Sequence, residues 1–165
     1  LTAGAPEEMT MKITEAGFAF PVFGFAPDDT LGWQCDDLSG MMTAREPVFR
    51  LHWPKNLELV DANGSRWAVK SVRRVGRSGS LFGWLVLAPL GKNRCRIEWD
   101  LEPLAPLSLA DVQNLACDTT ARFGEVDDWN EELEAETAGE IAKIRNTRSI
   151  AELTPLLNWP SFASY

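Results

Sequence analysis

A catalytic mechanism in this chain would have to be built around one histidine. His52 is the only histidine among the 165 residues, and it lies in an apolar, aromatic segment, Leu51-His52-Trp53-Pro54. A histidine acts as a general base when a nucleophile and an orienting carboxylate lie within hydrogen-bond reach. A lone histidine in such a segment is more often a packed or surface residue. We therefore expect no catalytic residue, and an enzyme with a cleft around His52 remains the alternative.

The three cysteines do not indicate a metal or redox site. Cys35, Cys95 and Cys117 are widely spaced and form neither a CxxC motif nor a Cys/His pair suited to zinc. Thiols that stay unpaired and buried are typical of a reducing compartment. The sequence therefore predicts buried cysteines and a cytoplasmic location.

Paired aspartates and one glycine-rich loop are the remaining candidates for chemistry. The pairs Asp28/Asp29, Asp36/Asp37 and Asp127/Asp128 lack the spacing of a calcium loop, and helix capping accounts for such pairs. The loop Gly76-Arg77-Ser78-Gly79-Ser80 lacks the Lys-Ser/Thr ending of a phosphate-binding loop, and an apolar run follows it. We expect no metal and no cofactor.

Charge is distributed unevenly along the chain. Residues 1–45 carry a net charge of −5, residues 46–98 carry +6 and residues 99–165 carry −9, for a total of −8. The basic block supplies one candidate binding surface, because arginine pairs well with carboxylates and phosphates. Its candidate residues are Arg66, Lys70, Arg73, Arg74, Arg94 and Arg96. Neutralisation by the acidic C-terminal block is the competing interpretation, and the net charge of −8 makes nucleic acid an unfavourable partner.

The acidic block supplies the opposite hypothesis, a negatively charged surface that binds a basic partner. Its candidate residues form a dense negative run with one aromatic side chain: Asp127, Asp128, Trp129, Glu131, Glu132 and Glu134. Such a surface attracts a basic protein at electrostatically steered rates. Small acidic domains without a catalytic set are typical of bacterial immunity and inhibitor proteins that neutralise basic partners. The first functional hypothesis is therefore a non-catalytic protein-binding domain of that kind.

Strands are predicted in the first two thirds of the chain. Residues 57–75 predict a β-hairpin, because two strand-like runs flank the Asn63-Gly64 pair that suits a tight turn. The continuous apolar run 81–88 predicts a strand covered on both faces. Strict alternation of apolar and charged residues predicts a strand over 94–101. Residues 11–26 predict one or two short strands at a sheet edge.

Helices are predicted in the last third. Ser108 and Asp111 resemble a capping box at the start of a helix that ends at Gly124, and a second helix is expected from Asp127 or Asp128 to about Arg145. Short helical segments follow from Ser149. Strands followed by helices, without βαβ alternation, predict the α+β class. The expected fold is an antiparallel sheet of 4–6 strands covered on one face by the C-terminal helices.

A single domain is expected over residues 11–165, after a flexible or processed segment at residues 1–10. The longest apolar stretches are about half the length that a bilayer requires, so no membrane segment is expected. The expected partner is another protein, of basic character, and a nucleic acid is not expected.

Overall fold

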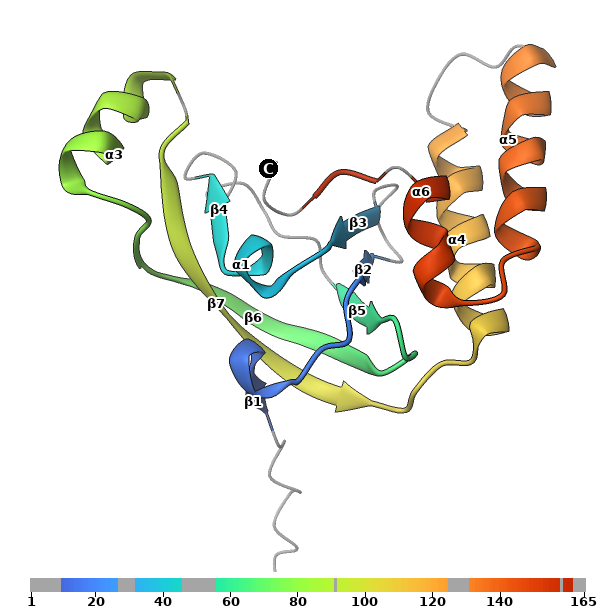
Figure 1. The fold of residues 1–165 in the computed structure, drawn as a ribbon, viewed down its shortest axis with the longest axis horizontal. Coiled ribbons are helices and arrows are strands. Elements are labelled where there is room, and N and C mark those ends of the chain that lie inside the picture. The colour runs from blue at the N-terminus through green and yellow to red at the C-terminus, as the bar shows by residue number, and fades with distance from the viewer. Residues whose placement is uncertain are drawn as a thin grey trace, which may run out of the picture.

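The computed structural model describes residues 10–26, 32–45, 56–90, 92–124, 131–157 and 159–161, without the side chains of 123, 124 and 131–134. Within these residues the chain forms one antiparallel sheet and a set of helices, which confirms the α+β class (Figure 1). The sheet has seven strands, one more than the upper end of the expected range. They are β1 (Met11–Lys12), β2 (Val22–Phe25), β3 (Gly32–Cys35), β4 (Thr43–Arg45), β5 (Glu58–Asp61), β6 (Arg66–Arg77) and β7 (Arg94–Leu104).

The strand order is β1-β7-β6-β5-β2-β3, and β4 pairs with β7 as well. The predicted hairpin is confirmed as β5 and β6, which pair from Val60 opposite Arg66 to Glu58 opposite Ala68. The turn contains Gly64 at φ +81°, a conformation that favours glycine. Strand β2 lies between β5 and β3, so only part of the region 11–26 lies at a sheet edge.

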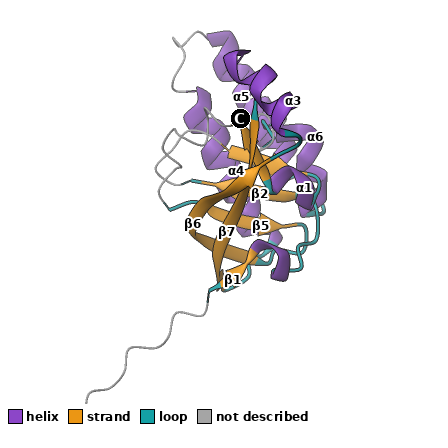
Figure 2. Ribbon diagram, turned by 90° about the vertical axis from the view of Figure 1, so that its left-hand side faces the viewer, coloured by secondary structure: helices purple, strands orange, loops and turns teal. Residues whose placement is uncertain are grey.

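Strands β6 and β7 form the longest pairing in the sheet, from Arg66 opposite Leu104 to Arg77 opposite Cys95. Strand β5 pairs with the first residues of β6, up to Ala68, and the rest of the β6–β7 ladder runs on past it. Two register shifts interrupt the ladder, and such irregularities increase the local twist. We call residues 70–97 the arm. Figure 2, viewed from the side of the arm, shows the two strands side by side.

The described helices are α1 (Leu38–Met41), α3 (Leu81–Leu87), α4 (Leu109–Gly124), α5 (Glu131–Arg145) and α6 (Thr154–Leu157), with 3-10 turns at 13–15, 88–90 and 150–153. The predicted capping box of α4 is confirmed. The Asp111 N–H donates to Ser108 Oγ at 3.2 Å, and the Ser108 N–H donates to the Asp111 carboxylate at 3.0 Å. Within the described part of the chain, no helix is long and apolar enough to cross a membrane.

The prediction of a strand over residues 81–88 was wrong, because this run forms α3 at the tip of the arm (Figure 1). Ser80 caps the helix, since its Oγ accepts the N–H of Gly83 at 3.1 Å. A short apolar run does not by itself distinguish a strand from a helix. Here the serine cap and the leucines favour a helix.

Two apolar cores lie on opposite faces of the sheet. The first contains Val22, Leu59, Ile97 and Trp99. The second contains Phe23, Phe25 and Val60 together with residues of α4 and α5 and the C-terminal turns, among them Val112, Ala116, Ile144 and Leu153. Neighbouring residues of β2 and β5 thus enter different cores, as the alternation of side chains along a strand requires. The C-terminal helices cover one face of the central strands, which confirms that part of the prediction.

Candidate binding surface

Three of the six predicted basic residues are paired with acids of the sheet itself. Arg66 binds Glu58, with Nη2 2.6 Å from Oε2, and Lys70 binds Glu102 at 2.5 Å. Arg73 pairs with Glu98, the residue directly opposite it in the ladder. Oppositely charged residues that face each other across strands stabilise the pairing. These three bases therefore contribute to the sheet.

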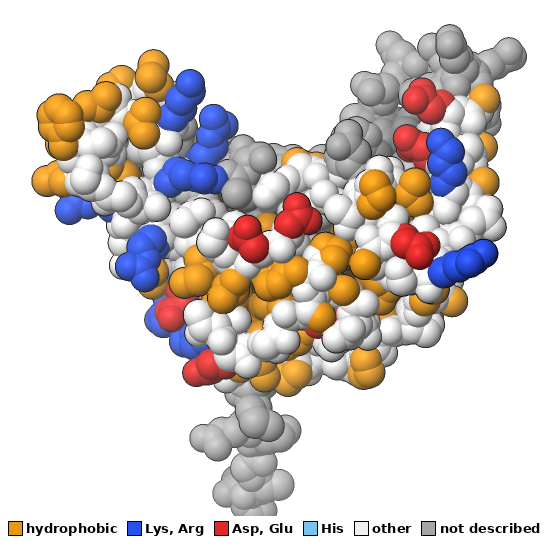
Figure 3. Space-filling model, viewed as in Figure 1, with side chains coloured by type: hydrophobic (Ala, Val, Ile, Leu, Met, Phe, Trp, Pro, Cys, Tyr) orange, Lys and Arg blue, Asp and Glu red, His pale blue; other side chains and the backbone are white. Residues whose placement is uncertain are grey.

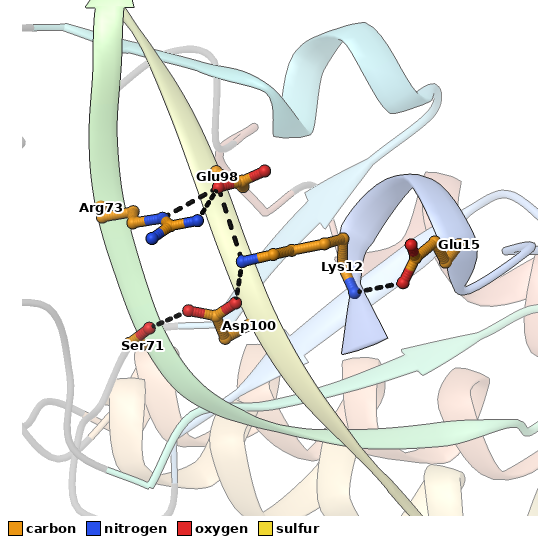
Figure 4. A network of polar contacts seen from close by, with 6 residues as sticks. All are labelled: Lys12, Glu15, Ser71, Arg73, Glu98 and Asp100. Atoms are coloured by element: carbon orange, nitrogen blue, oxygen red, sulfur yellow. Dashed lines mark hydrogen bonds and ion pairs between the residues drawn. The ribbon is translucent and has the colours of Figure 1, made fainter. Parts of the chain in front are cut away.

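Two further side chains, those of Lys12 and Ser71, extend this network of ion pairs across the exposed face of β7 (Figure 4). Lys12 of β1 binds Asp100 and lies 3.5 Å from Glu98, and Ser71 Oγ donates to Asp100 at 2.6 Å. The hydrogen bond from Lys12, with that from Ser71, holds the pKa of Asp100 below its ordinary 3.8. The hydrogen bond from Arg73 likewise lowers the pKa of Glu98 below 4.5.

The bases of this part of the sheet are thus neutralised locally. The sequence left open whether the acidic C-terminal helix would pack on the basic sheet. In the structure α5 packs against α4, at the opposite end of the molecule from the arm (Figure 1). The partners of Arg66, Lys70 and Arg73 come from β5 and β7 instead.

The other three predicted bases lie farther along the arm. Arg74 and Arg96 are exposed and Arg94 is partly buried. Arg77 and Lys92 join them, and both are exposed. No aspartate or glutamate occurs anywhere from residue 62 to residue 97. The outer part of the arm is therefore a positively charged surface.

Helix α3 presents an apolar surface at the tip of this basic arm. Phe82 is 79% exposed and Val86 is 55% exposed, whereas Trp84 of the same helix is half-buried. The exposed positions repeat at i and i+4, as in the pairs 81/85 and 82/86, so they share one side of the helix. We define the apolar cap as the exposed side chains of Val75, Leu81, Phe82, Leu85, Val86, Leu87 and Leu90.

Several large apolar side chains exposed on one short helix are unusual on a free domain, and such surfaces are typical of interaction sites. Figure 3 shows hydrophobic side chains gathered over the region of α3, with Lys and Arg side chains next to them. Acidic side chains appear at the opposite upper end of the same view, over the region of α5. Lys and Arg side chains lie among these acids, so only the arm end, with its apolar and basic tip, is uniform in the sign of its charge.

The predicted acidic surface lies largely outside the described residues. Asp127, Asp128 and Trp129 fall in the undescribed segment 125–130. Glu131, Glu132 and Glu134 belong to α5, but their side chains are not described. Glu136 and Glu140, which continue the run, are exposed. Binding by the acidic residues therefore stays a prediction.

The described residues also bear on the chemical candidates. His52 lies outside them, so the prediction of a cleft around it is untested. Cys35, Cys95 and Cys117 are buried, and none of the three forms a disulfide. In the part of the chain that the structure covers, no three His, Cys, Asp or Glu side chains cluster as metal ligands would.

The apolar cap is the feature that sequence reasoning missed. Its signal was present as an apolar run without acids, with Arg77 before it and Lys92 after it. A continuous apolar run predicts a buried strand, because such runs are usually covered. Exposure at the tip of an arm depends on tertiary structure.

Comparisons with protein-family models, with curated proteins and with solved structures find no match for this chain. Function is therefore inferred from the surface alone.

Proposed function

We propose that this chain is a non-catalytic protein-binding module that docks through the tip of its arm. The apolar cap enters an apolar groove on a partner protein, and the surrounding bases face acidic residues at the rim of that groove. The observation that carries the proposal is the exposed apolar side of α3 on an arm without acids. Recognition of a helix by a groove uses anchors at i and i+4, which is the spacing of Leu81/Leu85 and Phe82/Val86.

Both components of the surface are needed for binding. Full burial of a Leu, Val or Phe side chain contributes about 1.5–3 kcal/mol. Leu85 and Val86 are a little over half exposed, so each has roughly half of that to contribute. The whole cap then offers several kcal/mol, comparable to the cost of association of about 4–15 kcal/mol. Ionic contacts from the arm are required to add affinity and to speed encounter.

A nucleic acid fits this surface poorly. Phosphate binding requires a sustained basic patch, and here Glu98, Asp100 and Glu102 interrupt the basic face. The most exposed part of the tip is apolar, and it offers no partner to a phosphate backbone. The nucleic-acid alternative is therefore less favoured than a protein partner.

A flat anionic membrane also fits poorly. Helices α3 and α5 extend toward the same edge of the view in Figure 1, at opposite ends of the molecule. A flat negative surface that meets α3 from this side would also approach the exposed Glu136 and Glu140. A protein with a groove binds α3 without approaching the acids of α5. Acidic residues on the rim of that groove would then pair with the bases of the arm.

The acidic end supports a second proposal. The exposed Glu136 and Glu140 extend the run that begins at Asp127, which suits capture of a basic protein. An immunity or inhibitor role would use that surface. The two proposals place the interface at opposite ends of the molecule, so one experiment separates them.

The experiment places a photocrosslinking residue at Phe82 or, as the matched exposed position on α5, at Glu136. We expect crosslinking to a partner protein from position 82. With the purified partner, Phe82→Ser combined with Val86→Ser should weaken binding at least about 100-fold, because central apolar anchors dominate such interfaces. The thermal midpoint should not fall, since both side chains are exposed.

Crosslinking from position 136 alone would overturn docking by the arm and support the acidic surface. Two other occupants give distinct results with the same double variant. Flotation of the chain with phosphatidylserine vesicles, lost in the variant, would replace the partner protein by a membrane. A dimer detected by light scattering, lost in the variant, would replace it by a second copy.

A further inference from the structure

The outer edge of β6 has no neighbouring strand over the length of the arm. Strand β5 pairs with β6 up to Ala68, and the Val69 N–H donates to the Leu57 carbonyl at 2.9 Å. Strand β6 runs on to Arg77, and among the described strands only β7 pairs with this part. We call the outer side of residues 70–77 the open edge.

The register identifies the backbone groups that face the open edge. The Ile97 N–H donates to the Met42 carbonyl, on the side of β7 where β4 lies. Alternate residues of a strand direct their backbone groups to opposite sides, so residues 94, 96, 98 and 100 face β6. The Ser78 N–H accordingly donates to the Arg94 carbonyl at 3.0 Å. Because residues 71, 73 and 76 of β6 lie opposite 100, 98 and 96, residues 72, 74 and 77 point outward.

Val72 and Arg77 leave backbone groups without a partner on this side. Outside the β6–β7 ladder, neither backbone is hydrogen-bonded to a described residue. Arg77 and the nearby Val75 are exposed, so no described segment covers them. Such an edge is a template for a further strand. Val75 belongs to the apolar cap, and the open edge is therefore continuous with the docking surface.

Charge selects the strand that can join this edge. Residues 70–77 contain four bases and no acid. The same edge of a second copy would bring like charges opposite one another, which destabilises strand pairing. Acidic side chains on an added strand would instead lie beside the bases of β6, where opposite charges stabilise the pairing.

We propose that the partner protein adds an extended acidic segment to the open edge of β6. The proposal rests on docking by the arm and adds a second element of the partner, beside the groove that receives α3. The segment pairs with the outward backbone groups of Val72 and Arg77. In strand addition, main-chain hydrogen bonds supply affinity and the side chains supply specificity.

The test follows amide hydrogen exchange in the full ¹⁵N-labelled chain, with a short peptide of alternating glutamate and threonine as the probe. In the free chain, the amides of Val72 and Arg77 should exchange fast, and those of Ser71 and Arg73, which face β7, slowly. Saturating peptide should slow exchange at Val72 and Arg77 at least about ten-fold. A peptide of alternating lysine and threonine, at the same ionic strength, should not.

A proline at position 72 removes an outward donor and no hydrogen bond to β7. Val72→Ala is the matched control, because it loses the same side-chain packing and keeps the N–H. Val72→Pro should bind the acidic peptide at least about ten-fold more weakly than Val72→Ala, the loss of about 1.4 kcal/mol expected for one hydrogen bond. Should Val72→Pro fail to fold, exchange at Arg77 in the parent chain decides.

Each other outcome overturns the assignment. Slow exchange at Val72 and Arg77 in the free chain would mean that the edge is not open. Fast exchange that the acidic peptide leaves unchanged would mean that the edge accepts no strand. Equal protection by the lysine peptide would remove the role of charge. Protection that rises with the concentration of the chain alone would replace the partner by a second copy.

Failure of this proposal is distinguishable from failure of docking by the arm. The peptide titration needs no partner, and Phe82→Ser with Val86→Ser should leave it unchanged. Crosslinking from position 82 without a response to the peptide would mean that the tip docks through its apolar cap and exposed bases alone.

Discussion

Trp99 shows how one side chain can connect two parts of the fold. It is fully buried, and its Nε1 donates to the Met41 carbonyl at the end of α1 at 2.7 Å. The indole therefore fills the first core and satisfies a backbone acceptor of a short helix. Trp84 lacks the second property, since its indole N–H has no described acceptor.

This difference predicts unequal effects of one substitution. Trp99→Phe should lower the free energy of unfolding by about 1–3 kcal/mol, because it leaves the Met41 carbonyl buried and unpaired. Trp84→Phe, the matched control on the exposed arm, should cost less than about 1 kcal/mol. Urea unfolding followed by circular dichroism measures both. Equal losses would mean that the hydrogen bond of Trp99 adds nothing.

The network of polar contacts in Figure 4 predicts that the stability of the folded chain depends on pH. The pKa values of Asp100 and Glu98 are lowered in the folded chain, so their contribution is present above their ordinary 3.8 and 4.5. It is lost as the pH falls through the lower folded values, because both states are then protonated.

Lys12→Met removes the largest cause of the shift at Asp100. The variant should therefore be less stable than the parent at pH 7, and the difference should shrink as the pH falls below 3.8. Lys143→Met on α5 is the control. Urea midpoints at a series of pH values test this, and a Lys12→Met difference that stays constant with pH would contradict it.

At the scale of elements, the β5–β6 turn is held by a close approach to the segment before α4. The Leu107 N–H donates to the Gly64 carbonyl at 2.8 Å, and a Cβ at Gly64 would lie 2.3 Å from the Leu107 oxygen. The Asn63-Gly64 pattern predicted the turn from local conformation. The second requirement at Gly64, space for Leu107, arises from packing.

Gly79 allows these two requirements to be separated. Its φ of +84° resembles the +81° of Gly64, but a Cβ there would meet nothing within 4 Å. Gly79→Ala should cost about 1–2 kcal/mol from conformation alone. Gly64→Ala should cost at least about 1 kcal/mol more, because backbone must move. Thermal unfolding measures the loss of stability in both variants. Equal losses would show that the backbone at Leu107 moves away from the new Cβ at no cost.

Local signals predicted some elements well and others badly. The β5–β6 hairpin, the strand at 94–101 and helix α4 each carry a complete local signal: a turn pair, a strict alternation and a capping box. The segment of α3 carries mixed local signals: its continuous apolar run suits a buried strand, whereas the Ser80 cap and the leucines favour a helix. In the structure this run lies at the tip of the arm, where its large apolar side chains are exposed to solvent.

At the scale of the whole molecule, the arm and α5 place opposite charges at opposite ends. If the arm is the docking site, the bases should mainly set the rate of association with the partner, and the apolar cap should mainly set the rate of dissociation. Arg77→Gln with Arg96→Gln should slow association with the partner and reduce its salt dependence. Phe82→Ser should mainly speed dissociation. Stopped-flow or surface binding kinetics measure both.

The control for this division lies at the other end of the molecule. Lys143→Gln with Arg145→Gln removes two charges from the last turn of α5 and should leave both rates nearly unchanged. Docking by the arm would be contradicted if this control slowed association as much as the arm variant does.

The acidic end has its own prediction. If it binds a basic partner, neutral substitutions at Asp128, Glu131, Glu132 and Glu134 should abolish capture of that partner and leave the melting curve unchanged. If the arm is the interface, the same variant keeps its partner. A pulldown with the crosslinked partner as bait decides between the two ends.

The sequence by itself determined the α+β class, the hairpin, the alternating strand β7 and the segregation of charge into blocks. These depend on nearest neighbours along the chain, such as a turn pair, a period of two or a capping serine. Tertiary structure alone decided which bases pair with acids of the sheet and which lie on the outer part of the arm. Arg73 faces Glu98 only because of the β6–β7 register, and α3 is exposed only because the ladder runs past β5. Strand register and the reach of an arm are long-range properties, and pairing between distant residues sets them.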